Sequence, residues 1–139
     1  VGGFSLVDNT GLAANYSIGA VSFGYGETKH APAQRMNGAV NTVSVQHYEN
    51  NAYSLGFAVN ENLSVSYQVE QNERNDKTLA AKGGTTYVDN KVEAEADIFQ
   101  IAYNIGGATV GIAMVDTDNS DYTDNKEESK TVFSIAMEF

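Results

Sequence analysis

The residues with the clearest spacing for chemistry are the carboxylates of an acidic segment, residues 116–129. Asp116, Asp118 and Glu127 occupy the first, third and twelfth positions of this segment, where a calcium-binding loop places ligands. The sixth position holds Asp121 instead of the glycine that such a loop needs for its sharp turn, and no helical pattern flanks it. We therefore predict no built metal site but a solvated acidic loop, in which Asp116, Asp118 and Glu127 alone are spaced to bind Ca²⁺ or Mg²⁺.

Catalytic constellations are missing from the sequence. His30 and His47 fall in a predicted loop without a cysteine or acid at metal-ligand spacing, and the chain has no cysteine at all. It has no nucleophile elbow, phosphate-binding loop or zinc-protease motif, and Gly106-Gly107 is a turn signal. We expect no enzyme activity and no cofactor. The formal net charge of −10 would repel nucleic acid, which we do not expect as a partner.

The elements that position these residues are strands, because apolar residues recur at every second position. This alternation predicts seven strands, at residues 12–18, 21–26, 53–59, 63–70, 99–104, 108–115 and 131–139. Residues 2–8 form a shorter, poorly patterned candidate for an eighth strand. No segment has the apolar spacing of a helix, so we predict one all-β domain over residues 1–139.

The connections between the predicted strands alternate in length. Gly19-Ala20, Asn60-Glu61-Asn62 and Gly106-Gly107 are tight turns, whereas residues 30–46, 72–92 and 116–129 are long polar loops that carry most of the charge. Short turns at one end and long loops at the other are typical of membrane-spanning β-barrels. Tyr16, Phe57, Tyr103 and Phe139 each fall at the short-turn end of a strand, which predicts an aromatic ring at one membrane interface.

The two faces of the predicted strands differ in a way that suggests their surroundings. A strand on the surface of a soluble protein would carry Lys, Glu and Arg opposite its apolar residues, but here that face carries Ser, Gly, Ala, Asn and Gln. We therefore predict an antiparallel transmembrane β-barrel with its bulky face toward lipid. The predicted lipid-facing residues are Phe57, Tyr67, Tyr103, Ile112, Phe133, Ile135 and Met137. The predicted pore-lining residues are Asn15, Ser54, Ser64, Ser66, Gln68, Gln100 and Asn104.

The last predicted strand carries the strongest resemblance to a known class. Residues 131–139 end on Phe139 with apolar residues at alternate positions before it, and resemble the C-terminal signature that the barrel-assembly machinery of Gram-negative bacteria recognises. Residues 53–67 and 102–114 resemble the last hairpins of alphaproteobacterial general diffusion porins. The resemblance covers about residues 11–139 and marks Phe139 as the assembly signal.

This resemblance implies a place in the cell and partners. General porins are outer-membrane homotrimers of roughly 16-stranded barrels, each with a water-filled channel for small hydrophilic solutes. The chain would then be the C-terminal half of one barrel, in contact with outer-membrane lipid and lipopolysaccharide, whose phosphates Ca²⁺ or Mg²⁺ can bridge to external acidic loops. The family's constriction loop lies in its first half, outside the resemblance.

Two other functions remain open at this stage. Seven strands cannot close an antiparallel barrel, so the chain is truncated, a second chain completes it, or the eighth strand is real. With an eighth strand the chain would be a small closed outer-membrane barrel with an adhesive or structural role. In a soluble β-barrel that binds an apolar ligand, Phe57, Leu63, Val65 and Tyr67 would instead face inward.

Overall fold

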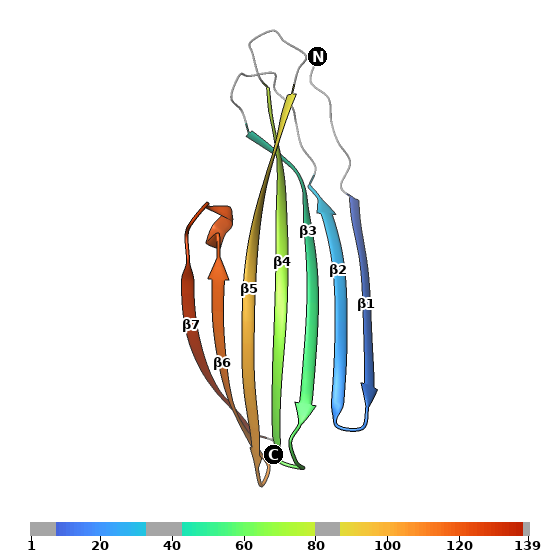
Figure 1. Cartoon of the computed structure of the whole chain (residues 1–139), viewed down its shortest axis with the longest axis vertical. Coiled ribbons are helices and arrows are strands. Elements are labelled where there is room, and N and C mark those ends of the chain that lie inside the picture. Colours follow the sequence, from blue (N-terminus) through green and yellow to red (C-terminus); the bar gives the residue numbers. More distant parts are fainter. Residues whose placement is uncertain (1–7, 33–42, 80–86, 138–139) are drawn as a thin grey trace.

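The computed structural model describes residues 8–32, 43–79 and 87–137, which form one antiparallel sheet (Figure 1). Its strands are β1 (Asp8–Ile18), β2 (Val21–Ala31), β3 (Val43–Ala58), β4 (Leu63–Leu79), β5 (Tyr87–Ile105), β6 (Ala108–Asp118) and β7 (Glu128–Met137). They lie side by side in sequence order. The prediction of an all-β chain with seven antiparallel strands is confirmed. The predicted strand at residues 2–8 lies outside the described residues, except for Asp8, which begins β1.

Tight turns join the strands at one end of the sheet, as predicted. Gly19, Gly106 and Gly107 have φ angles of 58°, 55° and 93°, which side chains disfavour. Gly106-Gly107 is a two-residue turn between Ile105 and Ala108, and its two positive φ angles suit the right-handed twist of a hairpin. In the β3–β4 turn the Asn60 side-chain oxygen accepts hydrogen bonds from the backbone N–H groups of Asn62 and Leu63, each at 2.9 Å.

At the other end of the sheet the strands continue beyond the apolar alternation. The cross-strand register of β4 and β5 runs up to Leu79 opposite Tyr87, so the predicted loop at residues 72–92 is wrong and most of it is strand. Polar cross-strand pairs continue the ladder there, as Lys91 does with Glu73 at 2.8 Å. Figure 1 shows β3, β4 and β5 rising past the end of β6.

The other two predicted loops are also shorter than expected. β2 runs to Ala31 and β3 begins at Val43, which places His30 and His47 on strands and corrects their prediction as loop residues. β6 runs to Asp118 and β7 begins at Glu128. Between them lies η1 (Ser120–Tyr122), a 3-10 helix of three residues. It was not predicted, because no segment of the sequence has helical spacing of apolar residues.

The register sorts the side chains onto two faces. The apolar face carries rows of large side chains, such as Phe23, Leu55, Tyr67, Phe99 and Met114 on five adjacent strands. The polar face carries rows of small side chains, such as Ser22, Gly56, Ser66, Gln100 and Ala113 on the same five strands. Each of these rows stays on one face across all five strands. A slip of register by one residue would move the large side chains of a strand to the polar face and its small side chains to the apolar face.

The sheet encloses no apolar core. Within the described ranges the buried apolar residues are Val92 and Ala94, while Phe133, Ile135 and Met137 are 74%, 67% and 62% exposed. β1 pairs only with β2 and β7 only with β6 among the described strands, so the sheet is open at both edges. A sheet with this much exposed apolar surface and two free edges needs further partners.

Candidate functional site

The predicted pore-lining residues share the polar face. Asn15, Gly24, Ser54 and Gln68 form one row over β1 to β4, and Ser66 lies opposite Gln100. Ser64 and Asn104 follow at the same parity toward the tight turns. The structure thus brings all seven residues onto one surface, and their contact with water stays a prediction.

Glycines and serines interlock on this polar face. A Cβ atom built on Gly111 would lie 2.6 Å from the Ser134 side-chain oxygen, and the serine oxygens of Ser54 and Ser22 crowd Gly24 and Gly56 in the same way. Each serine therefore occupies space that a larger residue on the neighbouring strand would need. The pairing keeps the layer of side chains on this face thin.

Two shallow hollows lie on or beside the polar face. One, of about 240 Å³, is lined by residues of β4 to β7, including Ser66, Gln100 and Ser134. The other, of about 280 Å³, lies at the tight-turn end beside Asn60, Asn62 and Asn104. Hydroxyl and amide groups, which can both donate and accept hydrogen bonds, line both hollows beside apolar residues, and the Glu61 carboxylate joins them in the second. Such a surface can be wetted.

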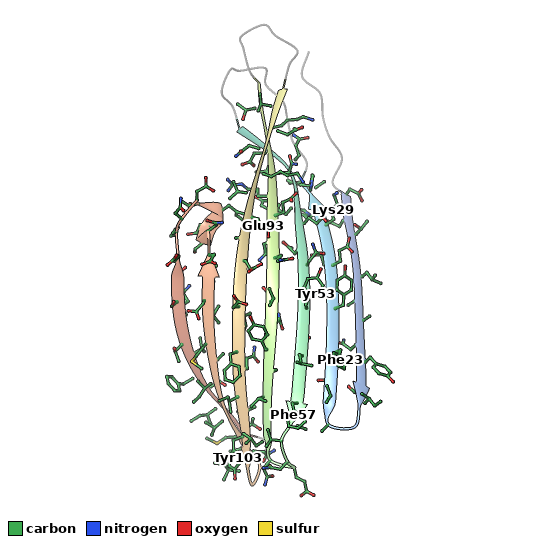
Figure 2. All side chains as sticks on the ribbon, in the orientation of Figure 1. Phe23, Lys29, Tyr53, Phe57, Glu93 and Tyr103 are labelled. Atoms are coloured by element: carbon green, nitrogen blue, oxygen red, sulfur yellow. The ribbon has the colours of Figure 1, made fainter. Side chains whose placement is uncertain are left out.

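The predicted lipid-facing residues share the apolar face. Register places Tyr103 opposite Val110, Ile112 opposite Phe133, and Val110 opposite Ile135. Phe57, Tyr67 and Met137 have the same parity, while Phe139 lies outside the described residues. Figure 2 shows Phe57 and Tyr103 near the tight turns, consistent with the predicted aromatic ring at that end.

A second group of aromatic residues, not predicted from the sequence, lies toward the other end of the apolar face. Tyr25 lies opposite Tyr53, with ring centroids 5.4 Å apart, and Tyr67 lies one residue pair nearer the tight turns, opposite Leu55. The Tyr25 hydroxyl donates to Glu27 at 2.9 Å, and the Tyr67 hydroxyl donates to Asp97. A tyrosine ring in an apolar zone with its hydroxyl on a carboxylate marks a boundary between apolar and polar surroundings. The sequence signal was the Tyr-x-Glu spacing at residues 25–27.

Beyond this boundary the apolar face becomes charged. Lys29 pairs with Glu49 at 3.5 Å, Gln71 donates to Glu95 at 2.8 Å, and Figure 2 shows Lys29 and Glu93 toward this end. From the alternation, strand acids are expected on the face opposite the apolar residues. Glu70 lies there, but Glu49 and Glu95 share the apolar face, which corrects this expectation. The charges predicted for loops lie largely on strand extensions.

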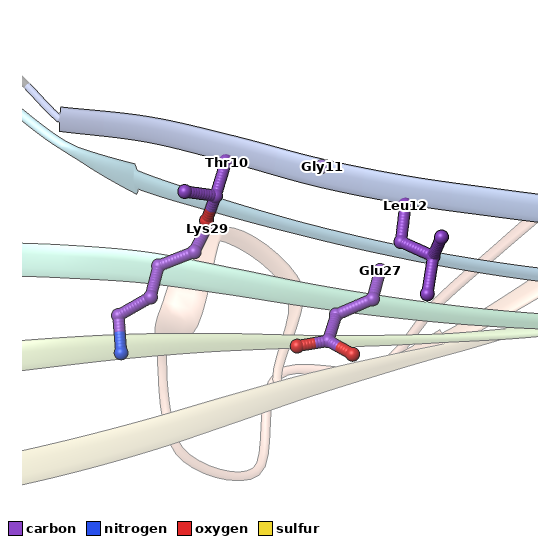
Figure 3. Close-up of a pocket in the computed structure, with 5 residues that line it drawn as sticks. All are labelled: Thr10, Gly11, Leu12, Glu27 and Lys29. Atoms are coloured by element: carbon purple, nitrogen blue, oxygen red, sulfur yellow. The ribbon is translucent and has the colours of Figure 1, made fainter.

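A hollow of about 230 Å³ lies in this charged zone, between β1 and β2 (Figure 3). Thr10, Gly11, Leu12, Glu27 and Lys29 line it. Figure 3 shows the Lys29 ammonium and the Glu27 carboxylate extending from β2 while Leu12 projects from β1. Apolar and charged groups meet here at the same height as the tyrosine boundary.

The structure does not gather the predicted metal ligands into a site. Asp116 and Asp118 lie on β6 on the apolar face, opposite Asp97 and Glu95, and Glu127 precedes β7. Among the described residues no group of three or more His, Asp or Glu side chains could hold a metal ion.

Between β6 and β7, ion pairs and hydrogen bonds engage Asp121, Lys126 and Glu128 instead. Lys126 beside Asp121 lowers the pKa of that carboxyl, and Asp121 in turn raises the pKa of Lys126. Hydrogen bonds from Lys130 and Ser120 lower the pKa of Glu128. The loop is therefore held together by its own side chains.

The chain matches no protein-family model, no curated protein and no solved structure. Within residues 8–32, 43–79 and 87–137, no helix is long and apolar enough to cross a membrane.

Proposed function

We propose that this chain forms part of the wall of an outer-membrane porin, a passive water-filled channel for small hydrophilic solutes. The observation that carries the proposal is the two-faced sheet, with an exposed apolar band on one side and a thin layer of small polar side chains on the other. Lipid would cover the apolar band and water the polar face. Both surfaces would then have the solvent that their chemistry requires.

The size of the exposed apolar surface supports a lipid environment. Tyr16, Phe23, Leu55 and Phe133 are between 48% and 74% exposed, and they belong to a continuous band rather than to scattered sites. Burying one such side chain contributes about 1.5–3 kcal/mol, so a band of this kind in water would drive aggregation. In a bilayer the same band stabilises the inserted state.

The height of the band agrees with membrane insertion. On β5 the apolar face is uninterrupted from Phe99 to Ile105 and ends at Asp97. Seven residues make six steps of about 3.4 Å, or roughly 20 Å along the strand before any tilt, and the tyrosine hydroxyls extend the boundary into the headgroup region. The tight turns would face the periplasm and the strand extensions the cell exterior, where lipopolysaccharide is the neighbour.

Barrel closure defines the partners that the proposal requires. The free edges of β1 and β7 would pair with strands outside the described residues, because open edges are not tolerated in lipid. We propose a roughly 16-stranded barrel in a homotrimer, inserted by the barrel-assembly machinery through its recognition of the C-terminal residues 131–139. A catalytic role has no part in this proposal.

Neighbouring residues on opposite faces of β6 provide the test. Ile112 lies on the apolar face and Ala113 on the polar face, and residues 1–139 contain no cysteine, so only cysteines elsewhere in the reading frame would need replacement by serine before labelling. In liposomes carrying the protein expressed from its complete reading frame, we expect Ala113→Cys to react with a membrane-impermeant maleimide and Ile112→Cys to resist it. Planar bilayers containing the wild-type protein should show stepwise conductance.

Each rival predicts a different result in these experiments. A small closed barrel would give no conductance, and its interior, filled by side chains, would also protect Ala113→Cys from the maleimide. A soluble ligand-binding barrel would stay monodisperse without detergent and would show no stable association with the liposomes. Either result would replace the porin proposal.

A further inference from the structure

The segment between β6 and β7 has an unusual backbone. Asn119, Asp121, Tyr122 and Asn125 have φ angles of 51°, 57°, 55° and 60°, in the left-handed region that non-glycine residues seldom adopt. Each such residue costs of order 1 kcal/mol or more, so four within one short loop persist only where surrounding contacts hold them. This loop, residues 119–127, is termed the β6–β7 loop.

Hydrogen bonds fix the β6–β7 loop from both ends. The Asn119 side chain accepts from the Asn125 backbone N–H at 2.9 Å and donates to the Glu93 carbonyl at 2.9 Å, which ties the loop to β5. Ser120 is buried and donates through its hydroxyl to Glu128 at 2.9 Å. These bonds determine the direction in which the loop leaves β6.

The β6–β7 loop folds over the polar face. Its partner Glu128 lies on that face, and so do Val92 and Ala94, the buried apolar residues of β5. β5 continues past the end of β6, and the loop lies beside this extension instead of continuing the hairpin outward (Figure 1).

Tyr122 reaches across the polar face from the tip of the loop. Its ring centroid lies 5.8 Å from that of Tyr48 on β3, and the Arg74 guanidinium of β4 lies 5.0 Å from its centre. Arg74 is itself held by Asp76, whose carboxylate accepts from its Nε at 3.0 Å. Asp76 is 3% exposed, and its second carboxylate oxygen has no hydrogen-bond partner among the described residues. Tyr48, Tyr122 and Arg74 therefore form one continuous cluster of aromatic and cation–π contacts.

We infer that the β6–β7 loop is a size-selecting constriction at the loop end of the channel, held across the polar face by the contact between Tyr122 and Arg74. The inference rests on the proposed porin function, because the polar face is then the channel wall. A loop over that face removes cross-section from the channel, whereas a loop pointing outward would leave it open. Tyr122 would determine the solute size limit, and Arg74 would be the positioning residue that holds it.

Conductance of the protein from its complete reading frame tests this inference. Tyr122→Ala should raise single-channel conductance about 1.5-fold or more and should admit larger uncharged sugars in liposome swelling. Arg74→Lys keeps the charge but loses the planar guanidinium, and should give a smaller rise in the same direction. Thr123→Ala, at an exposed neutral position of the same loop, is the matched control and should behave as wild type.

A distance measurement reports on the loop independently of transport. Spin labels at Asp124→Cys in the loop and Asn50→Cys on β3 should give one narrow distance distribution in the otherwise wild-type protein. The distribution should broaden with Tyr122→Ala and with Arg74→Lys.

If the wild-type protein conducts, and neither Tyr122→Ala nor Arg74→Lys changes its conductance or its sugar size limit, the inference is overturned while the proposed function stands. A wild-type protein without conductance would overturn the proposed function and the inference with it.

Discussion

Arg74 and Asp76 form the most enclosed ion pair among the described residues, with side chains 27% and 5% exposed. Removal of one partner from such a pair leaves the other charge without compensation in a poorly solvated position. We expect Arg74→Met to lower the free energy of unfolding by roughly 2–4 kcal/mol, less than for a fully buried pair because Arg74 remains partly solvated. Urea titration of the refolded protein would measure the loss. The double variant Arg74→Met with Asp76→Asn should recover most of the lost free energy. An equal loss in the single and the double variant would show that the uncompensated Asp76 charge is not its cause.

Asp121 and Lys126 make the β6–β7 loop sensitive to pH. The folded pKa of Asp121 is lowered from 3.8 by Lys126, so the pair's contribution is present above that value and disappears as the pH falls through the lower folded pKa. The folded pKa of Lys126 is raised from 10.5 by Asp121, so this contribution is present below pH 10.5 and disappears as the pH rises through the raised value.

The loop should therefore be ordered at neutral pH and loosen at both extremes. The mobility of a spin label at Thr123→Cys, followed between these limits, would measure the change. Lys126→Gln should remove the change in label mobility at both low and high pH. If the mobility of the variant still changes with pH as in the wild type, other groups cause the transition.

The Gly106-Gly107 turn is the element whose geometry depends most directly on residue type. Gly107 has a φ of 93° with no atom near its missing Cβ, so backbone conformation and not crowding restricts this position. Gly107→Ala should destabilise the β5–β6 hairpin by about 1–2 kcal/mol in unfolding measurements. Gly26→Ala on β2 is the control, because a Cβ there would lie at an ordinary 3.9 Å from Ala52. Equal effects at both sites would show that the turn is not under conformational restriction.

The hairpins could be predicted from the sequence because their signals are local. Alternation around Leu63 and Tyr67, and turn residues such as Gly106, determine the register and the two faces without reference to distant residues. The extensions of β4 and β5 were missed because pairs such as Lys91 with Glu73 hold the strands by charge and leave no apolar period.

The placement of the β6–β7 loop could not be read from its own residues. Tyr122 meets Tyr48 and Arg74 only after the four strands from β3 to β6 have paired, so the contact depends on long-range register. Positive φ angles at Asn119 and Asp121 are compatible with their residue types, but the same types occur in ordinary solvated loops. The sequence therefore predicted an acidic loop and not its direction.

At the scale of the whole molecule, the orientation of the sheet has a direct energetic test. An arginine at Ile112 would place a charge within the apolar band, at a cost of about 2–4 kcal/mol near the middle of a bilayer. Ala113→Arg, one residue along β6, would place the same charge on the polar face. We expect Ile112→Arg to lower the free energy of unfolding in lipid vesicles by about this cost. Ala113→Arg should lower it much less and should shift ion selectivity. The reverse order of stabilities would reverse the assignment of the faces.

The sequential order of the strands has a consequence for how such a wall can change over evolutionary time. Among the seven described strands, each pairs only with the strands before and after it in the chain, so none of them is inserted between elements that are distant in sequence. Duplication or loss of one hairpin would leave every remaining neighbour relation intact. Sheets of different width, and with the proposed function channels of different diameter, can therefore arise from one repeating unit by changes in copy number, without any new topology.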